Sequence, residues 1–408
     1  MHGRTRVGVA VAAFSVLAFA GCAPQDELSQ NELSAPESTI ATTTTETSSS
    51  SSEALRIDLN PNAIAYDYFN STHVPHGITG DEEFVFVTQP LSGRVSVVDR
   101  LLGREIATLT PPPGGWLLPF ALRMTDDGKL AVLDAGGFPN PNIPSVARIY
   151  EYEFRRNRRT RKFEANLTRT ISFAGLPIIF AEDLEVLPGG RYVLSESVIG
   201  ALWVVNADGS IAPGIMPDSL APGAAVPKLA GCAFTPVVIG GVPFSTAGNF
   251  APGVGALAVR NGQLYLGSSC RGGVARVPVA SLTDPTRSPE QRGNDIVDVS
   301  PRPIGTASEA LKGFAFNKWN NDNRLYVTDT IGRRVLRINL TTGAREVLAD
   351  DAQLFDFPVA AAFLPPVAGV SPLVVASDQE YRLAALNPLI TEDLLHPPFV
   401  VAKIYVVR

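Results

Sequence analysis

Short hydrophobic runs separated by polar turns recur six times along the chain. Each copy has an alternating run, a turn with Gly or Asn, a second apolar run that ends in a small residue followed by an acid or amide, and a third run. The clearest copies span 76–89 and 182–196. Turns of this kind join antiparallel neighbours, and repetition at this length indicates stacked copies of one unit. The pattern predicts an all-β fold: a six-bladed β-propeller of four-stranded antiparallel blades.

The spacing of the copies predicts where the propeller carries insertions. The copies start at residues 77, 121, 183, 256, 313 and 360. Because the three middle intervals exceed an ordinary blade, we expect insertions at 153–179, 213–253 and 281–309. The Pro/Gly-rich segment 213–253 is long enough to act as a lid. In the last copy we expect the third strand at 383–386, and either 55–59 or 402–407 closes the ring.

The first residues are typical of an export signal. Arg4 and Arg6 precede an apolar stretch from Val7 to Ala20, which is too short to span a bilayer as a helix. Small residues directly before Cys22 resemble a bacterial lipobox, which implies cleavage before Cys22 and a lipid on that residue. An ordinary secretory signal is the alternative. In a host with two membranes, Ala23 after the cysteine resembles an outer-membrane destination.

These features divide the chain into three parts: a lipoprotein signal peptide at 1–21, a lipid-anchored flexible linker at 22–53 and the propeller at 54–408. The linker is rich in Ser and Thr and cannot bury a core. We therefore expect an exported protein, lipid-anchored to the bacterial cell envelope, with a membrane contact through the lipid.

Composition supports one large folded part and argues against nucleic-acid binding. The 408 residues are 45% hydrophobic and 18% charged, which is ample for a buried core. The formal net charge is −6, and the linker holds acids but no Lys or Arg. One basic run at 155–162 is typical of a solvated hairpin turn. We expect a monomer that binds no nucleic acid.

The three cysteines divide into one lipid carrier and one pair. With Cys22 modified, Cys232 and Cys270 remain in an oxidising compartment, where a disulfide is expected. Two unpaired buried thiols are the alternative.

In a propeller blade, the start of the first strand and the end of the second lie at the same end of the channel. We call the residues before the first strands the leading positions and those ending the second strands the trailing positions. The leading positions are His76, Phe120, Glu182, Gly255, Lys312 and Val359. The trailing positions are Gln89, Asp134, Glu196, Ser269, Asp329 and Asp378.

Carboxylates therefore gather at one mouth, where they repel one another unless a cation compensates. One such cation is a divalent metal held by Glu182, Glu196, Asp134, Asp329 and Asp378. Another is Lys312, which with Glu182 and His76 makes a candidate catalytic set. In the structural alternative, the acids accept hydrogen bonds from backbone N–H groups and fix the blades.

The segments 180–209, 254–279 and 312–338 resemble blades of the SMP-30/gluconolactonase/LRE-like six-bladed propellers. That resemblance implies hydrolysis of a small-molecule lactone or ester with one divalent cation, Ca²⁺ or Zn²⁺, at the channel mouth. Glu182 matches a glutamate ligand of that family by type. Gly255-Ala256 and Lys312-Gly313 stand where the family has Asn-Gly and Asp-Gly. A non-catalytic surface propeller that binds a ligand or protein partner, with Lys312 in place of the metal, is the alternative function.

Overall fold

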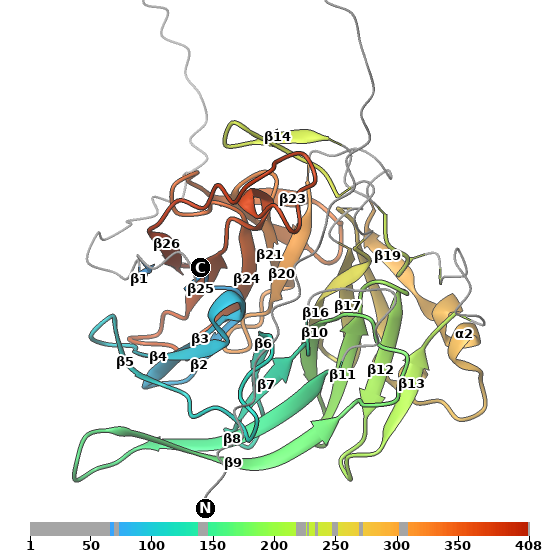
Figure 1. Cartoon of the computed structure of the whole chain (residues 1–408). Coiled ribbons are helices and arrows are strands. Elements are labelled where there is room, and N and C mark those ends of the chain that lie inside the picture. The colour runs from blue at the N-terminus through green and yellow to red at the C-terminus, as the bar shows by residue number, and fades with distance from the viewer. Residues whose placement is uncertain are drawn as a thin grey trace, which may run out of the picture. The chain divides into compact units, whose positions relative to one another are not determined.

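The computed structural model describes residues 73–137, 146–217, 226, 228–232, 236–246, 252–268, 272–301 and 309–406, together with the backbone of 66–68. Within these residues six four-stranded antiparallel sheets follow one another around a ring (Figure 1). This arrangement confirms the predicted six-bladed β-propeller.

The blades follow the chain order. Blade 1 has β2 (Ile78–Gly80), β3 (Phe84–Gln89), β4 (Arg94–Asp99) and β5 (Arg104–Thr108). Blade 2 has β6 (Pro119–Met124), β7 (Leu130–Asp134), β8 (Arg148–Arg156) and β9 (Phe163–Ser172). Blade 3 has β10 (Ala181–Leu187), β11 (Arg191–Glu196), β12 (Ala201–Val205) and β13 (Ile211–Ile215). Blade 4 has β16 (Val254–Arg260), β17 (Gln263–Ser268), β18 (Val274–Pro278) and β19 (Val297–Ser300). Blade 5 has β20 (Leu311–Ala315), β21 (Arg324–Asp329), β22 (Arg334–Asn339) and β23 (Arg345–Asp350). Blade 6 has β24 (Pro358–Phe363), β25 (Pro372–Ser377), β26 (Phe399–Tyr405) and β1 (Tyr66–Tyr68).

Blade 6 closes the ring with strands from both ends of the folded part. β26 pairs with β25, and β1 adds the outer strand by pairing with β26. The predicted C-terminal strand at 402–407 therefore belongs to this blade, and the other candidate, 55–59, lies outside the described residues. The predicted strand at 383–386 is wrong. That segment follows the short helix η3 (Glu380–Arg382). It turns back because Asp393 accepts the N–H of Ala384 and Asn387 donates to the carbonyl of Tyr381.

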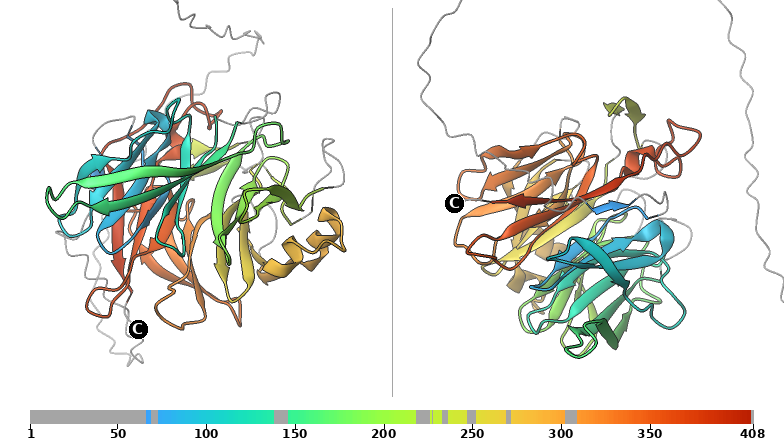
Figure 2. Two further views of the ribbon diagram at one scale, coloured as in Figure 1. Left: turned by 90° about the horizontal axis from the view of Figure 1, so that it is seen from below. Right: turned by 90° about the vertical axis from the view of Figure 1, so that its left-hand side faces the viewer.

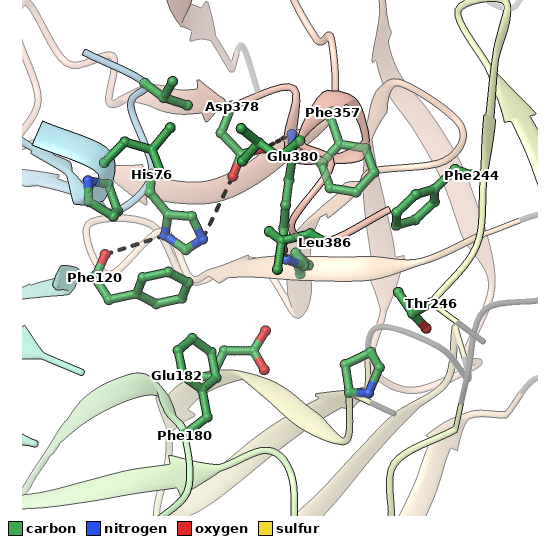
Figure 3. A pocket seen from close by; sticks show the side chains of 16 residues that line it. His76, Phe120, Phe180, Glu182, Phe244, Thr246, Phe357, Asp378, Glu380 and Leu386 are labelled. Atoms are coloured by element: carbon green, nitrogen blue, oxygen red, sulfur yellow. Dashed lines mark hydrogen bonds and ion pairs between the residues drawn. The ribbon is translucent and has the colours of Figure 1, made fainter. Parts of the chain in front are cut away.

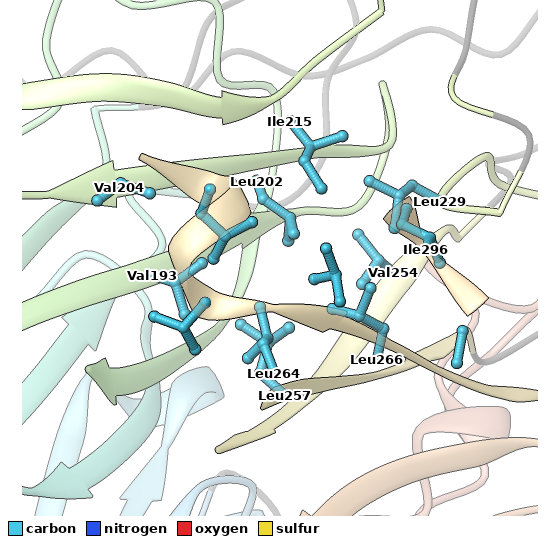
Figure 4. Close-up of a cluster of buried hydrophobic side chains, with 14 of the residues drawn as sticks. Val193, Leu202, Val204, Ile215, Leu229, Val254, Leu257, Leu264, Leu266 and Ile296 are labelled. Carbon is cyan, nitrogen blue, oxygen red and sulfur yellow. The ribbon is translucent and has the colours of Figure 1, made fainter. Parts of the chain in front are cut away.

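The core lies between neighbouring blades, so second strands such as β3 and β11 are buried on both faces, whereas outer strands such as β5 and β9 are partly exposed. Val193 and Leu202 of blade 3 pack against Leu257 and Leu264 of blade 4 (Figure 4). Similar clusters join the other neighbouring pairs, including blades 6 and 1. This explains why the second strands read as continuous apolar runs. Figure 2 shows the first and last blades side by side, as a closed ring requires.

The three predicted insertions take different forms. The stretch 153–179 lengthens β8 and β9, and the basic run forms their turn. The stretch 281–309 contains part of α1 (Val279–Leu282), α2 (Pro289–Arg292), η2 (Gly293–Asp295) and the regular fourth strand β19. The stretch 213–253 supplies a hairpin of β14 (Val237–Ile239) and β15 (Val242–Phe244). One further short helix, η1 (Pro90–Ser92), follows β3.

The β14–β15 hairpin is held against blade 6. Its Ile239, Val242 and Phe244 pack in one cluster with Phe357 and Tyr381. The side chain of Asn387 donates to the carbonyl of Pro243 at 2.8 Å. Figure 1 shows β14 beyond the ends of the blade strands. Phe244 and the following Thr246 also line a cavity at one mouth of the channel, while the role of 213–253 as a lid stays a prediction.

The predicted signal peptide at 1–21, the linker at 22–53 and Cys22 lie outside the described residues. Cys232 is disulfide-bonded, but its predicted partner Cys270 is also outside them, so the pairing stays a prediction. Among the described residues, no helix has the length and apolar character needed to cross a membrane.

Candidate functional site

A cavity at the lid-side mouth brings four of the predicted site residues together. His76, Glu182, Lys312 and Asp378 all line it, and Glu380 joins them (Figure 3). Part of the wall comes from segments outside the repeat. Phe244 and Thr246 belong to the hairpin segment, and Leu383 and Leu386 belong to the segment after β25.

Backbone bulges turn the leading positions toward the channel. In five blades, the pairing of the first two strands shifts register at the leading position. A bulge of this kind re-aims a side chain and is common beside functional sites. The residues in these shifts are Phe120, Glu182, Gly255, Lys312 and Val359.

The small hydroxyl residue of the repeat stabilises this local backbone. Thr328 Oγ1 accepts the N–H of Gly313 at 2.6 Å, and Ser195 Oγ accepts the N–H of Asp183 at 2.9 Å. In blade 1, Thr88 Oγ1 accepts the N–H of Gly77 at 2.6 Å. The repeated small residue therefore pairs a buried N–H that the strand ladder leaves free.

His76 presents an unprotonated nitrogen to the cavity. Its Nδ1 lies 3.4 Å from the carbonyl of Phe120, which can only accept a hydrogen bond, so Nδ1 is the donor. Its Nε2 is buried without a hydrogen-bond partner and lies 3.8 Å from Asp378 Oδ2. Burial, together with the charge of Lys312, lowers the pKa of His76 to about 3. The imidazole is therefore neutral at neutral pH, and its contact with Asp378 is not an ion pair.

Lys312 is the buried cation of the cavity. Its side chain is in an ion pair with Glu380, and Nζ lies 5.8 Å above the ring of Phe357. Burial acts to lower the pKa of Lys312, but the carboxylates of Glu380, Glu182 and Asp378 outweigh burial and raise it. The ammonium therefore stays charged across the physiological range.

Glu182 fits because its neighbour has no side chain. A Cβ on Gly255 would lie 2.4 Å from Glu182 Oε1, so the leading residue of blade 4 leaves space for the carboxylate of blade 3. Burial raises the pKa of Glu182, while Lys312 acts in the opposite direction. The departure from the family's Asn-Gly pattern at this point is thus tied to the packing of Glu182.

Asp378 and Glu380 come from the chain that leaves β25. Asp378 Oδ1 accepts the N–H of Glu380 at 2.9 Å. Burial, followed by the charge of Glu380, raises the pKa of Asp378 well above its ordinary value. Sequence reasoning missed Glu380 because it lies in the segment after the repeated phrase. Its only signal was its position two residues beyond a predicted site residue.

The other predicted carboxylates are turned away from the cavity. Asp134, Glu196 and Asp329 each accept backbone N–H groups from the loop before the first strand of their own blade. Donors include Leu118, Phe180 and Ala310, at 2.7, 2.9 and 3.0 Å. These contacts match the structural alternative for the trailing acids. Burial still raises the pKa of Glu196 to about 7.

Strand register explains why Asp378 differs from these three. Asp134, Glu196 and Asp329 pair with the residue just before each bulge, and in blade 6 the equivalent residue is Ser377. Asp378 lies one position further, and a shift of one residue reverses the face of a strand. In blade 4 the same register places Ser268, rather than the predicted Ser269, at the trailing position.

Asp183, next to Glu182, has a separate structural role. Its carboxylate accepts from Arg123 Nη2 at 2.9 Å and from the N–H of Leu257 at 2.8 Å. Arg123 also donates to Glu185 at 2.9 Å. This buried network joins blades 2, 3 and 4 around the channel.

The donor set does not fit the divalent cation that the family resemblance implies. His76, Asp378 and Glu380 place ligand atoms within 4.8 Å of one another, and such donors suit a metal. However, Glu380 is already the ion-pair partner of Lys312, so only two of the three donors are left for a metal ion. Asp134, Glu196 and Asp329 do not join this group. The positive charge of the site is supplied by Lys312.

Comparisons with known proteins extend only to the fold. The sequence matches no protein-family model, and no curated protein is similar to it at the sequence level. A structural-genomics protein of unknown function from Bacteroides thetaiotaomicron VPI-5482 superposes with a TM-score of 0.51 at 11% identity, covering 84% of this chain and 72% of that one. Luciferin-regenerating enzyme gives 0.50 at 11%, covering 83% and 92%. A glucose dehydrogenase gives 0.48 at 12%, covering 84% and 99%. At these identities the likeness to the first two structures concerns the fold alone, in agreement with the six blades described above.

Proposed function

We propose that the cavity is a small-molecule site and that the protein hydrolyses a small lactone or ester there. One observation carries this proposal: the buried ammonium of Lys312 lies among three carboxylates in a cavity with largely apolar walls. Ionisable groups with shifted pKa values that converge in an apolar pocket are typical of functional sites. The resemblance of the repeats to gluconolactonase-like blades suggests the substrate class.

The residues of the cavity have different roles in such a reaction. Glu182, whose pKa is raised by burial, takes a proton from a water molecule as its oxygen bonds to the carbonyl carbon. Lys312 stabilises the negative charge that develops on the carbonyl oxygen. The C–O ester bond then breaks, and Glu182 returns the proton to the leaving alkoxide. His76 Nε2 accepts a hydrogen bond from the water and orients it.

A lactone and ester panel tests this assignment. We expect the full-length protein to hydrolyse at least one γ- or δ-lactone or aryl ester, and Glu182→Gln to reduce kcat by about 100-fold or more, as for other general bases. Glu82→Gln, at an exposed position, is the matched control and keeps full activity. Absence of turnover across the panel, or full activity in Glu182→Gln, contradicts the proposal.

The role of Lys312 has its own test. Because Lys312 supplies the positive charge, excess chelator leaves the rate unchanged, whereas Lys312→Met abolishes it. A rate that disappears with chelator and returns with Ca²⁺ or Zn²⁺ would assign the charge to a divalent metal instead.

A second candidate is a non-catalytic ligand-binding propeller. Two observations favour it: the pKa of His76 is lowered to about 3, too low for proton exchange near neutrality, and Lys312 is already paired with Glu380. Saturable binding of lactones without turnover would support this candidate over the hydrolase.

We also propose that the protein is exported and held at the cell envelope by lipid on Cys22. In the producing cell, Cys22→Ala should move the protein from the membrane fraction to the soluble fraction. Retention in the membrane fraction would argue against the anchor.

A further inference from the structure

Two pairs of phenylalanine rings face each other across the cavity. Phe120 and Phe180 meet edge to face with ring centroids 5.1 Å apart, and Phe244 and Phe357 do the same at 5.7 Å. Figure 3 shows the pairs on two sides of the cavity, with the carboxylate of Glu182 directed between them. All four rings line the cavity.

The charges in the cavity do not balance. Among the described residues that line it, Glu182, Asp378 and Glu380 supply three carboxyl groups, Lys312 is the one basic side chain, and His76 is neutral. The ion pair between Lys312 and Glu380 leaves Glu182 and Asp378 to share a cation that already has a direct partner. Two buried carboxyl groups with so little compensating charge are costly to ionise, so this cavity favours a ligand that brings positive charge.

We propose that the ligand of this cavity carries an organic ammonium group, quaternary or highly methylated, that binds between the phenylalanine rings and the carboxyl groups of Glu182 and Asp378. The inference rests on the proposed function, since it takes this cavity as the substrate site. It narrows the substrate to an ester or lactone with a cationic amine.

Ring faces explain the preference for an alkylated ammonium group. Aromatic rings attract cations through the negative charge of their faces, and cages of such rings recognise quaternary ammonium ligands. Phe357 already has Lys312 Nζ above its ring. A primary ammonium would need acceptors for all three of its N–H groups, and the walls formed by phenylalanine rings offer none. The same rings offer no oxygen ligands to a metal ion, so an organic cation fits these walls better.

Calorimetric titration with two isosteric probes tests the proposal. Choline carries the quaternary ammonium, and 3,3-dimethylbutan-1-ol replaces its nitrogen by carbon. We expect the full-length protein to bind choline about tenfold more tightly or better, in line with the attraction of a desolvated ring for a cation. Glu182→Gln should remove most of that preference, whereas Glu82→Gln at an exposed position should keep it. Phe244→Leu, in the hairpin, should weaken choline binding more than binding of the neutral probe.

Equal affinity for the two probes, or no choline binding, overturns the inference, as does an unchanged preference in both Glu182→Gln and Phe244→Leu. Hydrolysis of acetylcholine and 3,3-dimethylbutyl acetate separates this outcome from failure of the proposed function. Equal hydrolysis of both esters overturns the inference and keeps the hydrolase. Selective choline binding without hydrolysis of either ester keeps the inference and overturns the hydrolase.

Discussion

Replacing Lys312 by methionine should destabilise the protein strongly. Lys312 is 8% exposed and is the cation shared by Glu380, Glu182 and Asp378. Methionine keeps most of the side-chain volume but removes the charge. Breaking a buried ion pair from one side costs about 3–5 kcal/mol, because it leaves the other charge buried and alone. We expect a loss of unfolding free energy of that size at pH 8.

The loss should depend on pH in a defined direction. Burial raises the pKa values of Glu182 and Asp378, and removal of Lys312 raises them further. At pH values above these pKa values, the carboxyl groups of the variant are ionised without a cation nearby. The loss of unfolding free energy is therefore largest at high pH. As the pH falls toward 5 the carboxyl groups protonate more readily, and the deficit shrinks.

Urea unfolding, followed by the fluorescence of the buried Trp116 and Trp203, measures both effects. Wild type, Lys312→Met and Lys312→Met/Glu380→Gln are compared at pH 8 and pH 5. The double variant should recover part of the lost unfolding free energy, since it no longer buries the negative charge of Glu380. A loss below about 1 kcal/mol at pH 8, or an equal loss at both pH values, would refute the idea that this ammonium holds the carboxyl cluster together.

Three further predictions concern neighbours of the same site. Gly255→Ala places a Cβ 2.4 Å from Glu182 Oε1, so it should displace the side chain of Glu182 rather than the backbone. We expect turnover to be lost while the urea midpoint changes little. Retained turnover would contradict the packing argument. Thr88→Val removes the acceptor for the Gly77 N–H, and an unpaired buried donor should lower the unfolding free energy by about 1–3 kcal/mol; a neutral effect in urea unfolding would refute this. His76 should stay neutral down to pH 5 in NMR titration, because burial lowers its pKa to about 3, and a midpoint near 6.5 would disprove it. Since protonation then favours the unfolded chain, the contribution of His76 to stability is lost as the pH falls from 6.5 toward 3.

Much of the fold could be predicted because the blades repeat. The apolar second strands, such as Phe84–Gln89 and Arg191–Glu196, are buried on both faces and so have the same composition in each copy. The repeat also predicted which chain positions share one mouth, and the cavity does contain His76, Glu182 and Lys312.

The prediction failed where the chain departs from the repeat. In blade 6 the segment between β25 and β26 is longer than a turn, and its apolar residues at 383–386 imitate a strand. Instead, Asp393 accepts the N–H of Ala384, and the neighbouring Asn387 donates to Tyr381 and to Pro243 of the β14–β15 hairpin. Such contacts join residues far apart in sequence, so no local pattern records them. Glu380, the partner of Lys312, was missed for the same reason.

The trailing acids show why residue type alone could not assign roles. Asp329 and Asp378 both follow a small residue at the end of a second strand. Asp329 pairs opposite the residue before the bulge, and its oxygens bind backbone N–H groups of its own blade. Asp378 lies one residue beyond the equivalent position and faces His76 instead. One residue of register thus separates a carboxylate that stabilises a blade from one that lines the cavity.

The position of the candidate site depends on where the repeat is irregular. Where the repeat is regular, the polar groups at the channel mouth satisfy one another and hold the blades together, which leaves little capacity to bind a ligand. Where it is irregular, the groups are left in need of a partner: Gly255 leaves room for Glu182, Lys312 brings a cation, and Glu380 arrives from outside the repeat. In this propeller the candidate site lies where the repeat is irregular, because the groups there are not all occupied by the neighbouring blades. The cavity at His76, Glu182 and Lys312 meets that condition, and the hydroxyl-stabilised bulges hold Glu182 and Lys312 in place.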